Sequence, residues 1–305
     1  MTVNVRCMAT GRRSERPPMN TPSITLDDAE RALPLLEENG YLLVRDVLPP
    51  EQVERARARC DSYLLADEDA ENEIEANALL RMPEMNFIFD ERVVRALRTW
   101  MGGSLVYYPN YIARLNRRTG WHVDNGFSPL FLPDASHVYD PGFRHVQCVV
   151  YLQDNRPGPG GGLDVRPGSH RWAATGDVPE DDHLTRTYPD VVSLDSRAGD
   201  LIVFDGRLMH RGTPQDGSAT HRKYGVFWSA SREDRRQRDR YIEYFQDRVD
   251  YLRTRNLPSE EFRRDVERHR LMGEVRFPDS YLPEAVEILR RHSVTPAELP
   301  RAAVR

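Results

Sequence analysis

The chain has 305 residues, which is long enough to bury a full hydrophobic core as one domain, with or without helical additions. Hydrophobic residues make up 39% of the sequence and charged residues 30%, a composition typical of a folded protein rather than a disordered one. The net charge of −5 lacks the basic surplus of nucleic-acid binders, and no stretch approaches the ~20 apolar residues that cross a bilayer. We therefore expect no nucleic-acid partner and no membrane partner.

The cysteines and the N-terminal residues indicate the compartment. Cys7, Cys60 and Cys148 lie far apart and form no C-x-x-C pair, and such a sparse, odd-numbered set indicates reduced thiols. Residues 1–20 contain arginines but no apolar segment of the kind that a secretion signal needs. The expected location is therefore the cytoplasm.

The N-terminal segment, residues 1–22, is polar, basic and proline-containing and is predicted to be a disordered tail. A single domain is predicted for residues 23–305. Thr25 and Asp28 resemble a capping box, and Gly40 is expected to end the helix that they open.

Two further helices are predicted before residue 105. Pro50 opens the first of them, because proline is tolerated at the first helical position. Asp90 caps the other, which closes at Gly102-Gly103. The acidic stretch from Asp67 to Glu75 is expected to be a solvated loop.

From Leu105 onward the sequence changes to short strand-like runs between turn residues. These runs are Leu105–Leu115, Trp121–Asp124, Val146–Leu152, Leu163–Arg166, Val191–Leu194, Leu201–Asp205 and Tyr224–Ala230. Many short strands at modest spacing predict a sandwich or a barrel, and the jelly roll belongs to that class. The long aromatic segment 126–143 is typical of a lid or a binding loop.

Beyond Asp234 the pattern becomes helical and highly charged. Its apolar stripe consists of Tyr241, Tyr244, Phe245, Val249 and Leu252. Such a stripe packs against the core of its own chain or forms the seam of a homodimer, and both readings stay open. We thus expect a β core at about 105–230 and a C-terminal helical extension at about 234–305.

One set of polar residues indicates chemistry. His122 and Asp124 lie two positions apart in a strand-like run, so their side chains point to the same face. His210 follows the predicted strand that ends at Asp205. Two imidazoles and one carboxylate hold Fe(II) on one face of an octahedron and leave three positions open. The pattern predicts a non-haem iron site.

Arg222 follows His210 by twelve positions, at the start of an apolar strand. A dicarboxylic 2-oxo acid that chelates the metal leaves its far carboxylate to be held, and a guanidinium does this with two charge-assisted hydrogen bonds. Thr213 is a hydroxyl that fits beside it. The alternative for Arg222 is an ordinary surface ion pair.

Four segments, in the same order, resemble the phytanoyl-CoA dioxygenase family of Fe(II)/2-oxoglutarate oxygenases. The match spans about Leu35 to Ala230. The four segments are Glu37–Leu48, Trp121-His122-Val123-Asp124 (W-H-x-D), Gly161–His170, which ends in P-G-S-H, and Ala198-Gly199-Asp200 through His210 to Arg222. Four motifs in register are far more specific than any one of them.

This resemblance implies a double-stranded β-helix, that is, a mainly β core within an α+β chain, with flanking N-terminal and C-terminal helices. It implies Fe(II) on His122, Asp124 and His210, with 2-oxoglutarate and dioxygen as cosubstrates. It also implies that Arg222 anchors the 2-oxoglutarate and that succinate and CO2 are released. Family members that halogenate lack the carboxylate ligand, so Asp124 favours hydroxylation or another two-electron oxidation. Desaturation, epoxidation and ring closure stay open beside hydroxylation.

Other residues are weaker candidates for the same site. Thr213 and Gln147 are candidate contacts of the cosubstrate. Arg114, Asn125 and Phe127 lie near the metal ligands in sequence and are candidate contacts of a small-molecule substrate.

Two alternatives remain at this point. A zinc hydrolase also uses two histidines and a carboxylate, although no H-E-x-x-H helix is present. A non-catalytic relative could bind a metal or a metabolite in the same β core. For the enzyme, the basic residues indicate the biological setting, because Lys223 is the only lysine and such arginine bias suggests a GC-rich bacterial genome. The expected substrate is then a small scaffold of natural product biosynthesis, with a primary metabolite as the second candidate.

Overall fold

The computed structural model describes the chain from residue 21 to residue 300 with gaps. The described residues are 21–66, 72–116, 119–124, 142–156, 160, 162–175, 187–214, 222–239, 241–243 and 260–300. The predicted N-terminal tail lies almost entirely outside them, as do most of the predicted lid 126–143 and four residues of the apolar stripe, Tyr244, Phe245, Val249 and Leu252.

The helices of the first third begin and end where their capping residues predict. Helix α1 (Ala29–Asn39) follows a 3-10 turn at Leu26–Asp28, and Gly40 ends it in the left-handed conformation with φ 81°. A side chain at Gly40 would lie 2.4 Å from Nδ1 of His170, so only glycine fits there. The Asp28 carboxylate accepts hydrogen bonds from the Thr25 backbone amide at 3.3 Å and from its hydroxyl at 3.2 Å. One of the two bonds of the predicted capping box is therefore present, at the start of the 3-10 turn.

Helix α2 (Pro50–Ala66) begins at the predicted proline, and α4 (Glu91–Met101) begins at the predicted cap. The Asp90 carboxylate accepts a hydrogen bond from the Arg92 amide at 2.8 Å, which satisfies a backbone donor of the first turn. Gly102 ends α4 in the left-handed conformation. Residues 67–71 of the predicted acidic loop lie outside the described residues. The end of that stretch differs from the prediction, because Glu73 starts the short strand β3 and Glu75 caps helix α3 (Ala76–Leu79).

Strands far apart in the sequence form one large sheet. Its members are β1 (Ser23–Ile24), β2 (Tyr41–Val44), β3 (Glu73–Ile74), β4 (Leu105–Leu115), β5 (His145–Tyr151), β8 (Leu201–Asp205), β10 (Tyr224–Arg232) and β11 (Val294–Pro296). The order is β1-β2-β8-β5-β10-β4-β11, with β3 paired to β4. The antiparallel pairs of β10 with β4 and with β5 form its centre.

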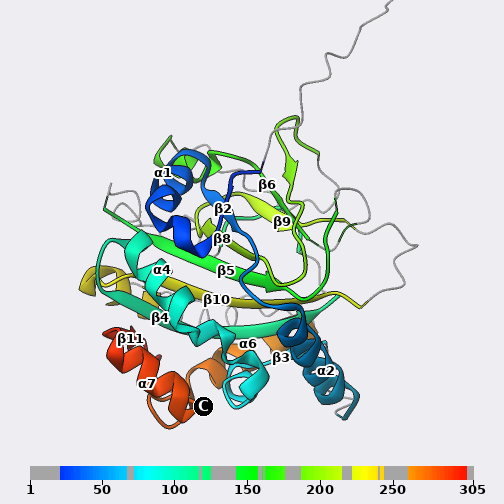
Figure 1. Cartoon of the computed structure of the whole chain (residues 1–305), viewed down its shortest axis with the longest axis vertical. Helices are drawn as coiled ribbons and strands as arrows, with labels where there is room; N and C mark the ends of the chain where they lie inside the picture. The colour runs from blue at the N-terminus through cyan, green and yellow to red at the C-terminus, as the bar shows by residue number, and fades with distance from the viewer. Residues whose placement is uncertain are drawn as a thin grey trace, which may run out of the picture.

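A second, three-stranded sheet is formed by β6 (Leu163–Val165), β7 (Val192–Ser193) and β9 (His210–Gly212) in the order β7-β6-β9. Figure 1 shows β6 and β9 on one side of β5, β10 and β4, with α2, α6 and α7 on the other side. Two facing sheets with flanking helices make the double-stranded β-helix that the sequence predicted.

The two faces of the large sheet contribute to two separate hydrophobic clusters, because successive side chains of a strand alternate. One face packs on the helices, and we call it the helix face; from β10 it buries Tyr224, Val226 and Trp228. The other face packs on the small sheet, and we call it the site face; it includes Val149, Tyr151 and Phe204 from β5 and β8.

Two predictions around the metal-ligand candidates differ from the structure. Residues 121–124 form a single bridge between His122 and His210 rather than a strand. His210 itself lies at the start of a strand that the sequence did not indicate. By contrast, Leu105–Leu115 and Leu201–Asp205 are strands over the predicted residues.

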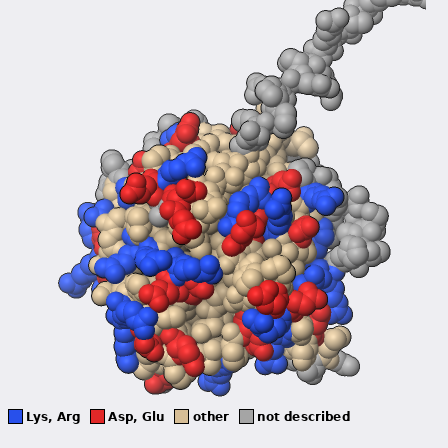
Figure 2. Space-filling view, viewed as in Figure 1, with Lys and Arg blue, Asp and Glu red and all other residues tan. Residues whose placement is uncertain are grey.

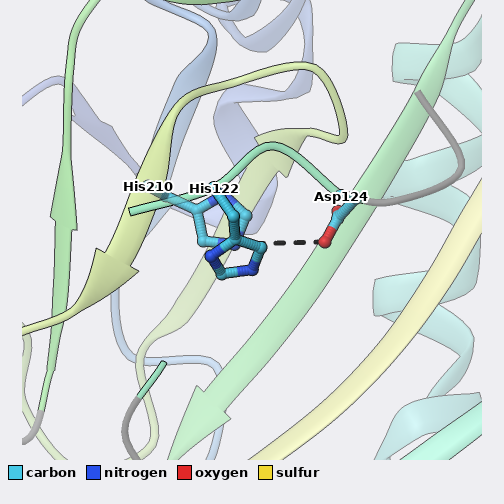
Figure 3. Close-up of side chains that lie close together, drawn as sticks. All are labelled: His122, Asp124 and His210. Atoms are coloured by element: carbon cyan, nitrogen blue, oxygen red, sulfur yellow. Dashed lines mark ion pairs between the residues drawn. The ribbon is translucent and has the colours of Figure 1, made fainter. Parts of the chain in front are cut away.

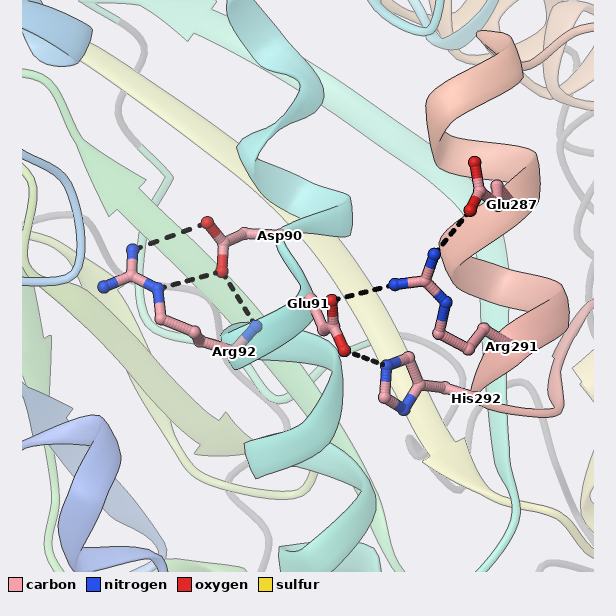
Figure 4. Close-up of polar contacts among 6 residues, drawn as sticks. All are labelled: Asp90, Glu91, Arg92, Glu287, Arg291 and His292. Carbon is pink, nitrogen blue, oxygen red and sulfur yellow. Dashed lines mark hydrogen bonds and ion pairs between the residues drawn. The ribbon is translucent and has the colours of Figure 1, made fainter.

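The C-terminal part contains α6 (Glu260–Met272), α7 (Pro283–Arg291) and β11, which pairs in parallel with β4. Glu91, at the start of α4, contacts Arg291 and His292 at the end of α7, each at 3.1 Å (Figure 4). Arg291 also pairs with Glu287 one turn earlier. The charges of this extension thus attach it to the core of its own chain.

Charged groups of both signs are mixed over the surface face shown in Figure 2, in line with the many ion pairs between neighbouring side chains. Within the described ranges, no helix combines the length and the apolarity that a membrane crossing requires.

Candidate metal centre

Two short segments bring the metal-ligand candidates together at the edge of the small sheet. His122 and His210 face each other across an antiparallel bridge, in which each backbone N–H donates to the carbonyl of the other at 2.9 Å. The two imidazole rings lie 4.2 Å apart between centroids. Backbone pairing therefore places two residues that are 88 positions apart in the sequence side by side.

The same kind of hydrogen bond to a backbone carbonyl orients both histidines. Nδ1 of His122 lies 2.7 Å from the Gly120 carbonyl, and Nδ1 of His210 lies 2.9 Å from the Leu208 carbonyl, two residues upstream in each case. A carbonyl only accepts, so Nδ1 of each ring carries the proton and Nε2 presents a lone pair. Such a hydrogen bond behind the ring is the usual support of a metal-ligating histidine.

Asp124 completes the set. Its backbone amide donates to the Gly206 carbonyl at 3.1 Å, which holds the residue beside the turn that precedes β9. One carboxylate oxygen, Oδ1, lies 4.0 Å from Nε2 of His210 (Figure 3). One ligand atom from each of His122, Asp124 and His210 lies within 4.8 Å of the other two, the spacing of groups that share one metal ion.

Burial tunes both kinds of ligand. Burial lowers the pKa of His210 to about 4, so the imidazole is neutral at physiological pH, as a metal ligand must be. Burial raises the pKa of Asp124 to about 6, although the charges of His122 and Arg114 and a hydrogen bond from Gln147 oppose the rise. The desolvated carboxylate therefore lacks sufficient positive charge around it.

The second carboxylate oxygen of Asp124 also indicates that a cation binds here. Oδ2 is buried and has no hydrogen-bond partner among the residues that the structure describes. A buried carboxylate oxygen without a partner is costly, and a bound cation removes that cost. Together with two neutral imidazoles aimed at the same point, Asp124 fits a divalent metal ion of the Fe(II) type.

Two of the weaker candidates lie beside this centre. Gln147, on the site face of β5, donates a side-chain hydrogen bond to Asp124. Arg114, at the end of β4, lies close enough for its charge to lower the pKa of that carboxyl group. Both side chains belong to the large sheet, whereas the metal-ligand candidates lie at the edge of the small one.

Arg222 lies elsewhere. It pairs with Asp61 of α2 at 2.6 Å, and 45% of its side chain is exposed. Asp61 also accepts a hydrogen bond from the Tyr224 hydroxyl, which belongs to the helix face. The described conformation of Arg222 is therefore the surface ion pair that the sequence left open, with Asp61 as its partner.

Thr213 also turns away from the metal-ligand candidates. Its hydroxyl donates to Asp164 at 2.8 Å, and Arg211 donates to the same carboxylate at 2.9 Å. Asp164 and Arg211 lie opposite each other on β6 and β9, on the side of the small sheet that faces away from the large one. Asn125 and Phe127 lie outside the described residues.

Sequence reasoning missed Tyr151 and Phe227, which belong to the hydrophobic cluster of the site face. Their rings meet edge to face with centroids 6.2 Å apart. The alternation of residues along β10 could have indicated Phe227, because it lies between Val226 and Trp228 and therefore points to the opposite face of the strand. Which of the two faces meets the site is known only from the pairing of β10 with its neighbouring strands.

The model of the phytanoyl-CoA dioxygenase (PhyH) family matches residues 36–223, which is more than half of the chain. The chain belongs to this family. The matched range contains both histidines, Asp124, Arg114 and Arg222.

Solved structures agree on the fold of this PhyH-family protein. AviO1 from Streptomyces viridochromogenes Tue57 is 20% identical, with a TM-score of 0.51 over 68% of this chain and 96% of that chain. HygX from Streptomyces hygroscopicus, solved with nickel and 2-oxoglutarate bound, is 16% identical, with a TM-score of 0.52 over 65% and 85%. EvdMO1 is 18% identical, with a TM-score of 0.50 over 66% and 49%. No curated protein matches the sequence significantly.

Family membership and geometry agree on the cofactors. The PhyH-family protein is an oxygenase that depends on Fe(II) and 2-oxoglutarate, and its two histidines and one carboxylate have the arrangement that this metal requires. When bound, the metal and the 2-oxo acid supply the oxidising power, while the protein supplies the geometry.

Proposed function

We propose that this protein is a dioxygenase that hydroxylates a small molecule of bacterial secondary metabolism and releases succinate and CO2 from 2-oxoglutarate. The observation that carries the proposal is the convergence of His122, Asp124 and His210, whose ligand atoms lie within 4.8 Å of one another. The three residues act as the metal ligands in this proposal, and they leave one face of the metal open to the cosubstrates.

The protein groups have distinct tasks. The backbone carbonyls of Gly120 and Leu208 keep the two imidazoles in the tautomer whose Nε2 binds metal. Gln147 holds the Asp124 carboxylate through a hydrogen bond. His210 is buried and Asp124 is half-buried, and this partial shielding from water strengthens the interaction of both ligands with a cation.

Hydroxylation rather than halogenation is proposed because Asp124 occupies the position that a halide takes in halogenating relatives. The bacterial setting rests on the sequence, in which Lys223 is the only lysine among 43 basic residues of the Lys and Arg type. A cytoplasmic location and a homodimer through the C-terminal helices remain predictions. The first is checked by cell fractionation and the second by the molecular mass in solution.

The test is metal-dependent turnover of the cosubstrate. Protein stripped with a chelator is reloaded with Fe(II) or with Zn(II), and succinate is measured in air with 2-oxoglutarate, first alone and then with a library of small natural products. We expect succinate with Fe(II) only, a faster rate with a true substrate, and one atom of isotopically labelled dioxygen in the product alcohol.

The same experiment separates the alternatives. A zinc hydrolase would turn over with Zn(II) and would consume no 2-oxoglutarate. A non-catalytic relative would bind metal or 2-oxoglutarate but produce no succinate under any condition. Either result would remove the oxygenase proposal.

A further inference from the structure

The segment that carries His122 has little backbone support. Among the described residues it pairs with β9 through the isolated bridge between His122 and His210, and the Gly212 amide adds one bond to the Thr119 carbonyl. A long ladder would fix the segment through many such bonds, and a single bridge does not. Side-chain contacts must therefore help to keep the His122 imidazole beside that of His210.

Trp121, the residue before His122, makes such contacts. Its indole is only 1% exposed and packs with Val123 and Met209 in a hydrophobic cluster. The Tyr188 ring stands perpendicular to the indole, with the two centroids 5.3 Å apart. Trp121 thus ties the His122 segment to the packed interior rather than to solvent.

Arg211, the residue after His210, lies over the same indole. Its guanidinium carbon is 4.7 Å from the centre of the Trp121 ring, within the range of a cation–π contact. One side-chain contact therefore joins the immediate neighbours of both histidines. Arg211 lies on the side of the small sheet that faces away from the large one, which we call the outer face, so this contact is made behind the two imidazoles.

Asp164 holds the Arg211 guanidinium in this position. It lies opposite Arg211 on β6, and its Oδ2 accepts a hydrogen bond from Nε of Arg211 at 2.9 Å. The side chains of the pair are only 2% and 9% exposed. Oδ1 accepts from the hydroxyls of Ser193 and Thr213 at 2.6 and 2.8 Å, so either hydroxyl alone satisfies it. A buried ion pair adds little net stability over apolar residues of the same size, so this pair indicates a task in geometry.

A second arginine supports the other side of the indole through Tyr188. The Arg166 guanidinium carbon lies 3.9 Å from the centre of the Tyr188 ring and 4.1 Å from that of Trp172. Arg166 itself pairs with both carboxylate oxygens of Asp190, at 3.0 and 3.1 Å. Trp121 is therefore held by two oriented groups, the Arg211 guanidinium and the Tyr188 ring.

We propose that Arg211 is a positioning residue of the metal centre. By holding the Trp121 indole on the outer face, it keeps His122 at the spacing from His210 that one metal ion requires. The inference rests on the metal centre of the proposed function. Arg211 touches neither metal nor substrate and acts only through Trp121.

The test uses Arg211→Lys in the full-length protein. Lysine keeps a cation for the buried Asp164 carboxylate, which guards against a folding defect, but it loses the planar group that stacks on Trp121. The matched control is Arg45→Lys, because Arg45 donates to the equally buried Asp200 at 2.8 Å, just after β2. Protein stripped with a chelator is titrated with Fe(II) without oxygen and with Co(II), by calorimetry. The visible absorption of the Co(II) form reports the ligand geometry, and urea unfolding of the metal-free protein reports stability.

We expect Arg211→Lys to bind both ions about tenfold more weakly, the lower end of the loss seen for residues that support a ligand. Its Co(II) spectrum should differ from that of the unmodified protein. Arg45→Lys should lose stability as Arg211→Lys does, yet keep the metal affinity and the Co(II) spectrum.

The route through Trp121 is tested with Trp121→Phe, which shortens the ring system under Arg211. Alone, this change should weaken metal binding to a similar degree. If Arg211 acts through Trp121, the double variant Arg211→Lys/Trp121→Phe should lose about as much affinity as the weaker-binding single variant, not the product of the two losses.

Three results would overturn the inference. The first is an unchanged metal affinity and Co(II) spectrum in Arg211→Lys. The second is an equal loss of metal affinity in Arg45→Lys, which would trace the effect to general destabilisation. The third is a double variant whose loss equals the product of the single losses. None of these readings needs turnover: a protein that forms no succinate with Fe(II) would end the oxygenase proposal and leave the role of Arg211 in metal binding to stand or fall on its own.

Discussion

The two faces of β10 differ in what they contribute, although their residues alternate along one strand. On the helix face, Val226 and Trp228 are fully buried against apolar side chains of the helices. On the site face, Phe227 is only partly buried, and the Ser229 hydroxyl donates to Asn110 of β4 at 2.7 Å. The helix face resembles any protein core, whereas the site face mixes polar groups with a few rings.

This difference separates stability from function within one strand. Apolar burial on the helix face stabilises the fold in proportion to the area removed from water. The site face stabilises the fold less, because burying a polar or charged side chain costs free energy unless that side chain is hydrogen-bonded or paired. Variants on the two faces should therefore fail in different assays.

The largest effect is expected for Asp124→Ala, which removes a proposed metal ligand. Metal affinity should fall by more than about 100-fold, beyond the loss typical of residues that only support a ligand, and succinate formation should cease. The metal-free protein should stay folded, since the buried carboxylate has a raised pKa and contributes no stability when charged. Calorimetric metal titration and thermal unfolding measure the two quantities.

Asp61→Ala is the matched control for Asp124→Ala, because it removes a carboxylate from the side of α2. It should bind metal like the unmodified protein. Full oxidation activity in Asp124→Ala, or equal metal affinities for the two variants, would contradict the assignment of the metal centre.

Trp228→Ala tests the helix face. The indole is fully buried, and its removal should lower the free energy of unfolding by about 3–5 kcal/mol, as for other large-to-small changes in a core. The protein that remains folded should bind metal normally. Phe227→Ala, on the partly buried site face, should cost less stability in the same urea titration. A larger loss in the free energy of unfolding for Phe227→Ala than for Trp228→Ala would contradict the assignment of stability to the helix face.

A smaller effect on the metal is expected from Gln147→Leu. This change removes the hydrogen bond from Gln147 to Asp124, so the carboxylate should be less well held. Metal affinity should fall by about 10- to 100-fold, the range seen when a supporting partner of a ligand is lost. Thr213→Val is the control, because the Thr213 hydroxyl bonds to Asp164 on the far side of the small sheet. Equal effects of the two variants would show that Gln147 has no particular role.

The smallest effect at neutral pH is expected for His145, which affects stability only on acidification. This residue is buried at the start of β5 against the rings of Tyr108 and Tyr241. Burial lowers its pKa from 6.5 to about 3, and Asp205 and Arg207 act on it in opposite directions. Below pH 6.5 the unfolded chain therefore binds a proton that the folded chain does not.

As the pH falls from 6.5 toward 3, His145 should reduce the free energy of unfolding by up to about 1.4 kcal/mol per pH unit. The metal-free variant His145→Leu should lack that part of the pH dependence. Urea titrations at several pH values below 6.5 measure it. If the two pH profiles run parallel, His145 is not a buried neutral histidine.

Local rules predicted much of the fold. The strands Leu105–Leu115 and Leu201–Asp205 were predicted to the residue, because continuous apolar runs between turns indicate buried strands. The cap at Asp90 and the glycines at 40 and 102 end their helices as expected, since their backbone preferences act over a few residues. Interactions between residues close in the sequence can therefore be predicted from the sequence.

The pairing of strands that are far apart in the sequence could not be predicted in this way. The three-residue strand β9 and the parallel pair of β11 with β4 are formed by segments too short to show a period of their own. His145 was another case, since its burial depends on the rings of Tyr108 and Tyr241, which are distant in sequence. Only the packed molecule brings these groups together.

The sequence alone determined which side chains are available for the metal, since the H-x-D spacing and the later His210 follow from residue type and order. Tertiary structure alone decided which neighbours face the metal-ligand candidates, such as Gln147, and which turn away from them, such as Arg211. The physical reason is the two-residue period of a strand: shifting the phase by one position moves a side chain to the opposite face, and that phase is set by pairing with neighbouring strands.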